Sequence, residues 1–183
     1  FWGSYVAPSK CGFFLNDQLT SFSVKEKATD SVHYIAPYKQ PVSHIMPTII
    51  LKDGKPYATL GSPGSMRIPS AVLQVILNLV DFDMDIQEAI NNSRIHSYCV
   101  QTADSTNMSG GATYLTHKLI YTESLAAAKE QLEAKNYYVY GYGALNNFFG
   151  GVQGITFNYN SDGSFASLMG GADPRRDGKA LAY

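Results

Sequence analysis

The segment that most constrains the fold is Pro47–Ile68, where two short apolar stretches flank an Asp-Gly pair and a glycine-rich turn follows. Asp53-Gly54 favours a two-residue hairpin turn, because both residue types tolerate a positive φ. The second stretch ends at Gly61-Ser62-Pro63-Gly64, and an apolar run of helical type extends from Ser70 to Asp81. We therefore predict a β-hairpin, a glycine turn and a helix in succession, with Ser70 as the helix N-cap.

The glycine turn is the first candidate site. Backbone N–H groups between the end of a strand and the start of a helix lack partners and can hold a carboxylate or a developing oxyanion. The alternative is that Gly61 and Gly64 only allow the chain to turn sharply. The sequence has no Gly-x-Ser-x-Gly elbow and no phosphate-binding P-loop, so these two kinds of site are excluded.

The other predicted elements alternate between strands and helices. The Ser70–Asp81 helix has almost no polar face, so we expect it to be buried on most sides. Asp85 is placed to cap a short helix through Ile90. Further strands are predicted at 11–16, 95–100, 119–121, 137–142, 155–159 and 164–169, and an amphipathic helix at 123–135. This order predicts a single domain over residues 1–183, of class α+β, with sheet packed against helices.

The amino-acid composition limits the kinds of partner that this chain can bind. Charged residues make up 16% of the 183, against about 25% in a typical globular domain. A surface with so little charge indicates a large protein partner. The net charge of -1 gives no basic field for nucleic acid or an anionic membrane, and no apolar run reaches the roughly 20 residues of a membrane span. The chain begins at Phe1 without Met, so we expect an internal piece or a processed product.

Cysteine and histidine usage predicts no metal site and no cofactor. Cys11 and Cys99 either pair in an oxidising compartment or stay as small buried hydrophobic residues, and we favour the second reading. The four histidines share no ligand spacing; they are His33, His44, His96 and His117.

Several motifs, in order along nearly the whole chain, resemble the small subunit of γ-glutamyltranspeptidases. They are Leu15–Phe22, Ile35–Pro37, Pro41–Ile49, Lys52–Pro56, Gly61–Ile68, Val72–Gln74, Arg94–His96 and Ala172–Arg176. Together they are far more specific than one glycine turn. The resemblance implies the N-terminal-nucleophile hydrolase fold, an αββα sandwich. It also implies a precursor that cleaves itself into two subunits and a new N-terminal Thr that takes the γ-glutamyl group and passes it to water or an amine.

The resemblance carries roles over to particular residues. Gly64 and Ser65 would supply the N–H groups of the oxyanion hole; the family usually has a second Gly at the position of Ser65, but the backbone donor survives that change. Ser43 and His44 stand where the family binds the glutamyl α-carboxylate with a Ser-Ser pair. Gln18 retains a polar side chain where the amino end of the substrate is bound.

The substrate prediction rests on Ser21, which occupies the position where typical members place an Asp against the substrate's α-ammonium. Losing that charge removes a hydrogen bond of about 1.5–3 kcal/mol. An internal residue of poly-γ-glutamate has no free α-amine, so it would be tolerated better than glutathione. This points toward the capsule-depolymerase branch. Arg67 and Arg175 could pair with the polymer's carboxylates, or they could form structural ion pairs instead.

Two hypotheses follow. The preferred one is that this chain is most of the small subunit of an extracytoplasmic γ-glutamyltransferase-like enzyme, in a heterodimer with the large subunit of the same precursor. Its Thr nucleophile would lie upstream of Phe1, so the chain alone would not be catalytic. The alternative is a non-catalytic descendant that binds a γ-glutamyl ligand or a protein partner. The sequence upstream of Phe1 would distinguish the two hypotheses.

Overall fold

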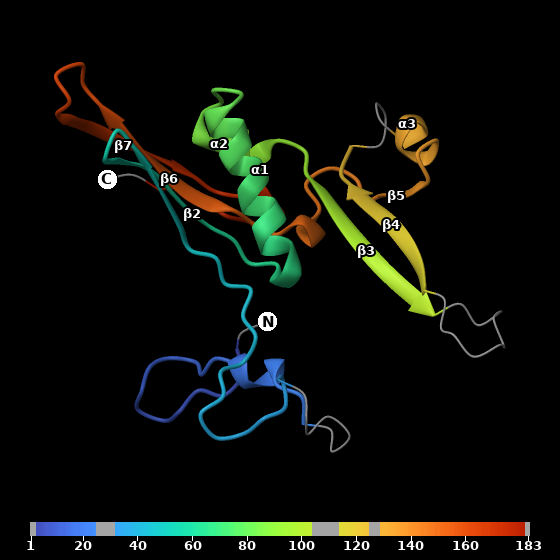
Figure 1. Cartoon of the computed structure of the whole chain (residues 1–183). Coiled ribbons are helices and arrows are strands. Elements are labelled where there is room, and N and C mark those ends of the chain that lie inside the picture. Colours follow the sequence, from blue (N-terminus) through green and yellow to red (C-terminus); the bar gives the residue numbers. More distant parts are fainter. Residues whose placement is uncertain (1–2, 25–31, 104–113, 125–128, 182–183) are drawn as a thin grey trace. The chain divides into compact units, whose positions relative to one another are not determined.

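The structure, a computed structural model, describes residues 3–24, 32–103, 114–124 and 129–181 (Figure 1). It divides into two compact units, Phe1–His44 and Ile45–Tyr183, which are described separately. That the whole chain acts as one domain stays a prediction. No helix in the described ranges is both long and apolar enough to cross a membrane.

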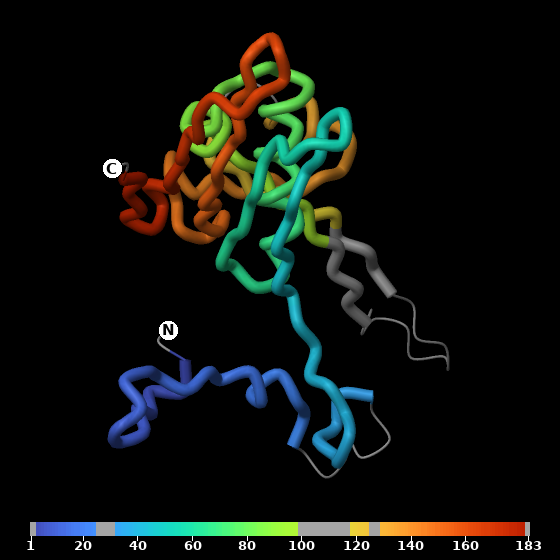
Figure 2. The backbone as a smooth tube through the Cα atoms, turned by 90° about the vertical axis from the view of Figure 1, so that its left-hand side faces the viewer, coloured from blue at the N-terminus to red at the C-terminus, as the bar shows by residue number. Residues whose placement is uncertain are grey.

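The first unit consists mainly of loops (Figure 2). Its one described helical turn is η1, Gln18–Ser21. The predicted strand at 11–16 is wrong: Leu15 is held only by isolated bonds, from its own N–H to Val6 O and from Ser4 N–H to its carbonyl oxygen, both at 2.9 Å. The apolar side chains of this segment stay exposed. Cys11 is also exposed and its thiol is free, which corrects the expectation of a buried residue, while the Cys99 side chain lies outside the description.

The second unit is built on a four-stranded antiparallel sheet. Its spatial order is β1 (Thr48–Lys52), β2 (Lys55–Gly61), β6 (Gln153–Tyr159) and β7 (Phe165–Gly171). Asp53 and Gly54 have φ of 52° and 75°, which confirms the predicted hairpin turn. The strands predicted at 155–159 and 164–169 are also confirmed, because β6 and β7 pair as a hairpin.

Two helices cover one face of this sheet: α1 (Ile68–Val80) and α2 (Ile86–Asn91). The core lies between them and the strands and contains Ala58, Leu60, Val72, Val75, Leu79, Ile86, Ile90 and Val152. The α2 prediction is confirmed, since Asp85 caps it in a capping box with Glu88. The Ser70 cap is wrong, because α1 begins two residues earlier with Arg67 at the cap position. A short turn, η3 (Ser65–Arg67), leads into α1.

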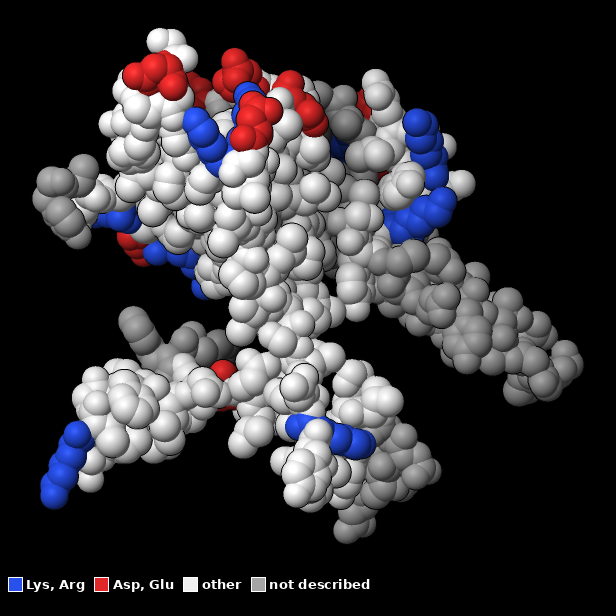
Figure 3. Space-filling model, turned by 60° about the vertical axis from the view of Figure 1, so that its left-hand side comes forward, with Lys and Arg blue, Asp and Glu red and all other residues white. Residues whose placement is uncertain are grey.

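The helices and the four-stranded sheet both carry apolar side chains on the surfaces that face away from the core. Leu73, Leu77 and Val80 of α1 are exposed, so the prediction of a helix buried on most sides is wrong for this chain. On the sheet face opposite the helices, Ile49 is 71% and Leu168 54% exposed. Figure 3 shows that acidic side chains gather along one edge of this unit, while most of the face in view carries no charge. The unit therefore has apolar surface available for a protein partner.

The second unit also contains a second sheet. It contains β3 (Ile95–Ala103), β4 (Tyr114–Thr122) and β5 (Tyr137–Gly141), with β3 and β4 antiparallel and β4 and β5 parallel. A short helix, α3 (Lys129–Glu133), lies between β4 and β5 in the chain. The predicted helix start at Glu123 is wrong, because Glu123 lies outside any helix and is buried.

Candidate active site

The glycine turn between β2 and α1 presents two neighbouring N–H groups. Gly64 (φ 134°) caps η3, and Ser65 is its first residue, so neither N–H has an intrahelical acceptor. Across the described chain, no hydrogen bond from either N–H is formed. The Gly64 carbonyl oxygen accepts from Arg67 N at 3.1 Å, and this bond orients the Gly64–Ser65 peptide, whose N–H belongs to Ser65. Together these two donors could bind an oxyanion.

Ser65 adopts an unusual backbone conformation for its residue type. Its φ is 55°, in the left-handed region that glycine enters freely and that costs other residues about 1–2 kcal/mol. Ser65 stands where the family resemblance predicts a Gly, and its backbone keeps the glycine conformation. The geometry of the turn is thus retained at a cost in stability.

The turn packs directly against a second glycine pair, Gly150-Gly151. A Cβ built on Gly64 would lie 3.2 Å from the Gly150 Cα, so the two backbones are in contact. Gly151 N donates to Ser62 Oγ at 3.1 Å, and Ser62 Oγ donates to the Pro63 carbonyl oxygen at 2.7 Å. The Gly150-Gly151 segment, about ninety residues later in the chain, therefore holds the glycine turn in place.

That segment is anchored by four buried charges, which three ion pairs join within the described residues, one of them between Arg175 and Asp173 at 3.2 Å. Arg94 contacts Asp173 at 2.8 Å, and Arg175 contacts Glu123 through both Nε and Nη2. Arg94 Nη1 also donates to the Phe149 carbonyl oxygen at 3.1 Å, and Val152 N donates to Asp173 Oδ2 at 2.7 Å. Burial lowers the pKa of Arg94, against the attraction of Asp173. For Arg175, burial also lowers the pKa, but the hydrogen bonds and charges of Glu123 and Asp173 together outweigh it and leave the pKa raised.

The contacts of Arg175 favour the alternative that it forms structural ion pairs and does not bind a substrate carboxylate. Its donors are taken by Glu123, by Asp173, and by the carbonyl oxygens of Ile90 and Asn92, and the side chain is fully buried. A substrate carboxylate has no access to such a group, so the expectation that Arg175 binds one is not carried further. The sequence alone showed the Asp173–Arg176 motif but gave no signal that Glu123 and Arg94 complete the cluster.

Arg67 differs from Arg175. Its guanidinium carbon lies 4.3 Å from the centre of the Phe148 ring, a cation–π contact, and no carboxylate is within 4 Å of it in the described part of the chain. Its Nε is buried without a hydrogen-bond partner there. Beside it, Ser70 Oγ lies 2.8 Å from His96 Nδ1 and donates to the Arg67 carbonyl oxygen. Burial and the nearby Arg67 charge lower the pKa of His96.

The remaining predicted residues lie in the first unit. Gln18 Nε2 donates to the Val42 carbonyl oxygen at 3.1 Å, so the carboxamide lies beside the segment that carries Ser43 and His44. Ser21 ends η1 and is exposed, as is Ser43, while His44 is half-buried. The structure thus brings Gln18 close to the Ser43-His44 segment within this unit.

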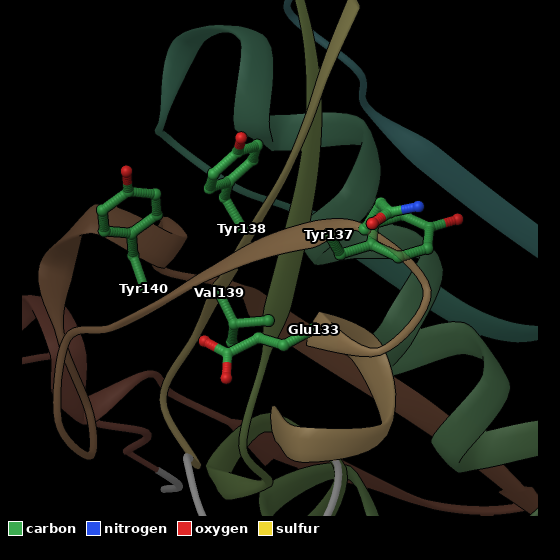
Figure 4. Close-up of a pocket in the computed structure, with 6 residues that line it drawn as sticks. Glu133, Tyr137, Tyr138, Val139 and Tyr140 are labelled. Carbon is green, nitrogen blue, oxygen red and sulfur yellow. The ribbon is translucent and has the colours of Figure 1, made fainter.

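Among the hollows in the described part of the second unit, one borders the glycine turn and another lies along β5. One, of about 640 Å³, opens on the sheet face away from the helices at the end that carries the glycine turn, where Gly61 and Pro63 line it. The other, of about 440 Å³, lies along β5 and the end of α3 (Figure 4). Its labelled side chains are Glu133, Tyr137, Tyr138, Val139 and Tyr140, and it contains no predicted site residue. Neither of these two hollows is lined by Gly64 or Ser65, and the first borders the glycine turn through Gly61 and Pro63.

Comparison with known proteins identifies the family. The family described as gamma-glutamyltranspeptidase matches residues 1–183 of the chain. The chain belongs to the γ-glutamyltranspeptidase family. It is 31% identical, over 95% of its length, to a glutathione hydrolase proenzyme of Escherichia coli, but it spans only 27% of that relative.

Solved structures of γ-glutamyltranspeptidases agree with the fold. A mutant γ-glutamyltranspeptidase of Helicobacter pylori is 28% identical, with a TM-score of 0.68, and the match covers 96% of this chain and 88% of that one. The transpeptidase enzyme CapD of Bacillus anthracis is 25% identical, with a TM-score of 0.64, covering 100% and 87%. The predicted α+β class and N-terminal-nucleophile hydrolase fold are thereby confirmed.

Proposed function

We propose that this chain is most of the small subunit of an enzyme that moves a γ-glutamyl group from an amide donor to water or an amine. The observation that carries the proposal is the pair of N–H groups at Gly64 and Ser65, which lack acceptors within the described chain, in a member of the γ-glutamyltranspeptidase family. The nucleophile is a Thr that precedes Phe1 in a longer chain, released as a new N-terminus by self-cleavage.

The reaction proceeds in two acyl transfers. The Thr hydroxyl adds to the γ-carbonyl carbon while its proton moves to the Thr α-amine, and the carbonyl oxygen becomes an oxyanion. The Gly64 and Ser65 N–H groups stabilise this charge; one such donor is typically worth about 10²–10³ in kcat. The C–N bond then breaks, and the amine leaves with the proton. Water or a second amine attacks the ester by the same path and regenerates the Thr.

The first unit recognises the glutamyl group. Ser43 and His44 bind its α-carboxylate, and Gln18 binds near its amino end. Ser21 supplies no charge to an α-ammonium, so the site favours poly-γ-glutamate, in which that nitrogen is an amide. Arg67, whose guanidinium has no carboxylate partner within the described chain, pairs with a carboxylate of the polymer.

A large subunit from the same precursor is the proposed partner. On the four-stranded sheet, the face away from the helices exposes Ile49, Ile155 and Leu168. This exposure supports the proposal that a sheet of the large subunit packs on that face and completes an αββα sandwich. By family resemblance, the heterodimer acts outside the cytoplasm.

The substrate proposal is tested with the full-length processed enzyme on glutathione and on poly-γ-glutamate. Ser21→Asp should raise kcat/KM for glutathione at least about 10-fold, the equivalent of one charge-assisted hydrogen bond. Ser21→Asn, which adds similar bulk without charge, is the matched control and should leave it within about three-fold. The substrate proposal is refuted if the unmodified enzyme prefers glutathione, or if the two variants behave alike. A full-length chain without a processing Thr would instead support a binding module.

A further inference from the structure

The contact between the glycine turn and Gly150 controls the direction of a catalytic N–H group. We propose that Ser62 and Gly150 are positioning residues, which hold the Gly64 N–H toward the oxyanion. The inference rests on the proposed function, and it assigns roles to two residues that do not themselves contact the substrate.

The first step in the argument is the planarity of the peptide bond. The Pro63 carbonyl and the Gly64 N–H belong to one trans peptide unit, so they point in opposite directions. Ser62 Oγ donates to this carbonyl oxygen at 2.7 Å. Fixing the carbonyl therefore fixes the N–H on the other side of the plane. Without this bond, the peptide is free to rotate, and rotation would move the donor away from the oxyanion.

The second step is that the Ser62 hydroxyl is itself held in place. It accepts a hydrogen bond from Gly151 N at 3.1 Å, which leaves its own proton directed at the Pro63 oxygen. An alanine at position 62 would lose both bonds, whereas a threonine would retain a hydroxyl that can make them.

The third step concerns the space around Gly150. A Cβ on this residue would lie 2.7 Å from Ser62 Oγ and 2.9 Å from the Pro63 oxygen, closer than real Cβ contacts. Gly150 also has a φ of 88°, which side chains rarely allow. A side chain here would push directly on the peptide whose N–H is the donor. The anchoring of Phe149 and Val152 by Arg94 and Asp173 prevents the Gly150 segment from moving aside.

The test compares four variants of the full-length processed enzyme in the hydrolysis of a γ-glutamyl anilide, with rates taken per processed subunit. Ser62→Ala should lower kcat about 10-fold or more with KM within two-fold, because a misdirected oxyanion donor weakens transition-state binding only. Ser62→Thr should restore kcat to within about three-fold. Gly150→Ala should lower kcat at least as much as Ser62→Ala.

The matched control is Gly163→Ala, in the turn between β6 and β7. Gly163 has a similar φ of 81°, but among the described residues its Cβ position would meet only Lys55 Nζ, the end of a flexible side chain. This variant should lose thermal stability, as Gly150→Ala does, and keep its kcat. A kcat within two-fold of wild type for Ser62→Ala, or equal losses in the Ala and Thr variants, would overturn the positioning role. An unmodified enzyme that cleaves neither the anilide nor poly-γ-glutamate would refute the proposed function instead.

Discussion

Replacing Glu123 by Gln tests whether the buried charges hold the second unit together. The carboxylate accepts four hydrogen bonds: two from Arg175, one from Arg94 N at 2.9 Å and one from Asn146 N at 2.7 Å. Glutamine has the same shape, but it loses the charge and turns an NH2 group toward donors that need an acceptor. Arg175 would keep only Asp173 as a charged partner.

The size of the expected loss of stability follows from the burial of both side chains. Both side chains of the Arg175–Glu123 pair are fully buried, so water cannot replace the lost carboxylate. Removing one partner of a buried pair costs about 3–5 kcal/mol, a large part of the roughly 5–15 kcal/mol that stabilises a typical domain. In a protein of this size, that loss corresponds to a fall in Tm of about 10 °C.

The assay is thermal and urea unfolding of the full-length protein. Glu133→Gln is the matched control, since Glu133 forms an exposed pair with Lys129 at 3.8 Å, and such pairs contribute at most about 1 kcal/mol. We expect a large loss of stability for Glu123→Gln and almost none for Glu133→Gln. Losses of equal size in the two variants would show that the buried cluster does not stabilise the fold as argued.

Two further predictions concern the helix start. Ser65→Gly should raise the free energy of unfolding by about 1 kcal/mol, because φ of 55° suits glycine; urea unfolding measures this, and a loss of stability would contradict it. The lowered pKa of His96 means that folding favours the neutral ring, so its contribution is present above the unfolded pKa of about 6.5 and is lost as the pH falls through the folded value. His96→Gln should therefore reduce the loss of stability between pH 7.5 and pH 5, and an unchanged pH profile would refute that.

The features that the sequence predicted correctly are local ones. The Asp53-Gly54 turn and the Asp85 cap depend on residues within four positions of each other, so their conformations follow from the residue types alone. The succession of strands along the chain, and the glycine turn, could be predicted for the same reason. The proposed function came from the family resemblance, since no single residue pattern carried it.

The wrong predictions involve contacts between distant parts of the chain. Ser70 is not the cap because its hydroxyl bonds to the Arg67 carbonyl oxygen and lies against His96, 26 residues later. Glu123 looks like the start of an amphipathic helix, yet it pairs with Arg175, 52 positions away. The apolar stretch at 11–16 has strand composition, but isolated bonds to Ser4 and Val6 hold it as a loop.

The separation of the buried charges along the chain affects how the protein is made. Arg94 and Glu123 leave the ribosome well before Asp173 and Arg175, the partners that neutralise them. At about 5–20 residues per second, the 52 residues between Glu123 and Arg175 take about 3–10 s to synthesise. During that interval the nascent chain contains two charged groups without their partners, and β1 and β2 are made before the strands β6 and β7 that complete their sheet.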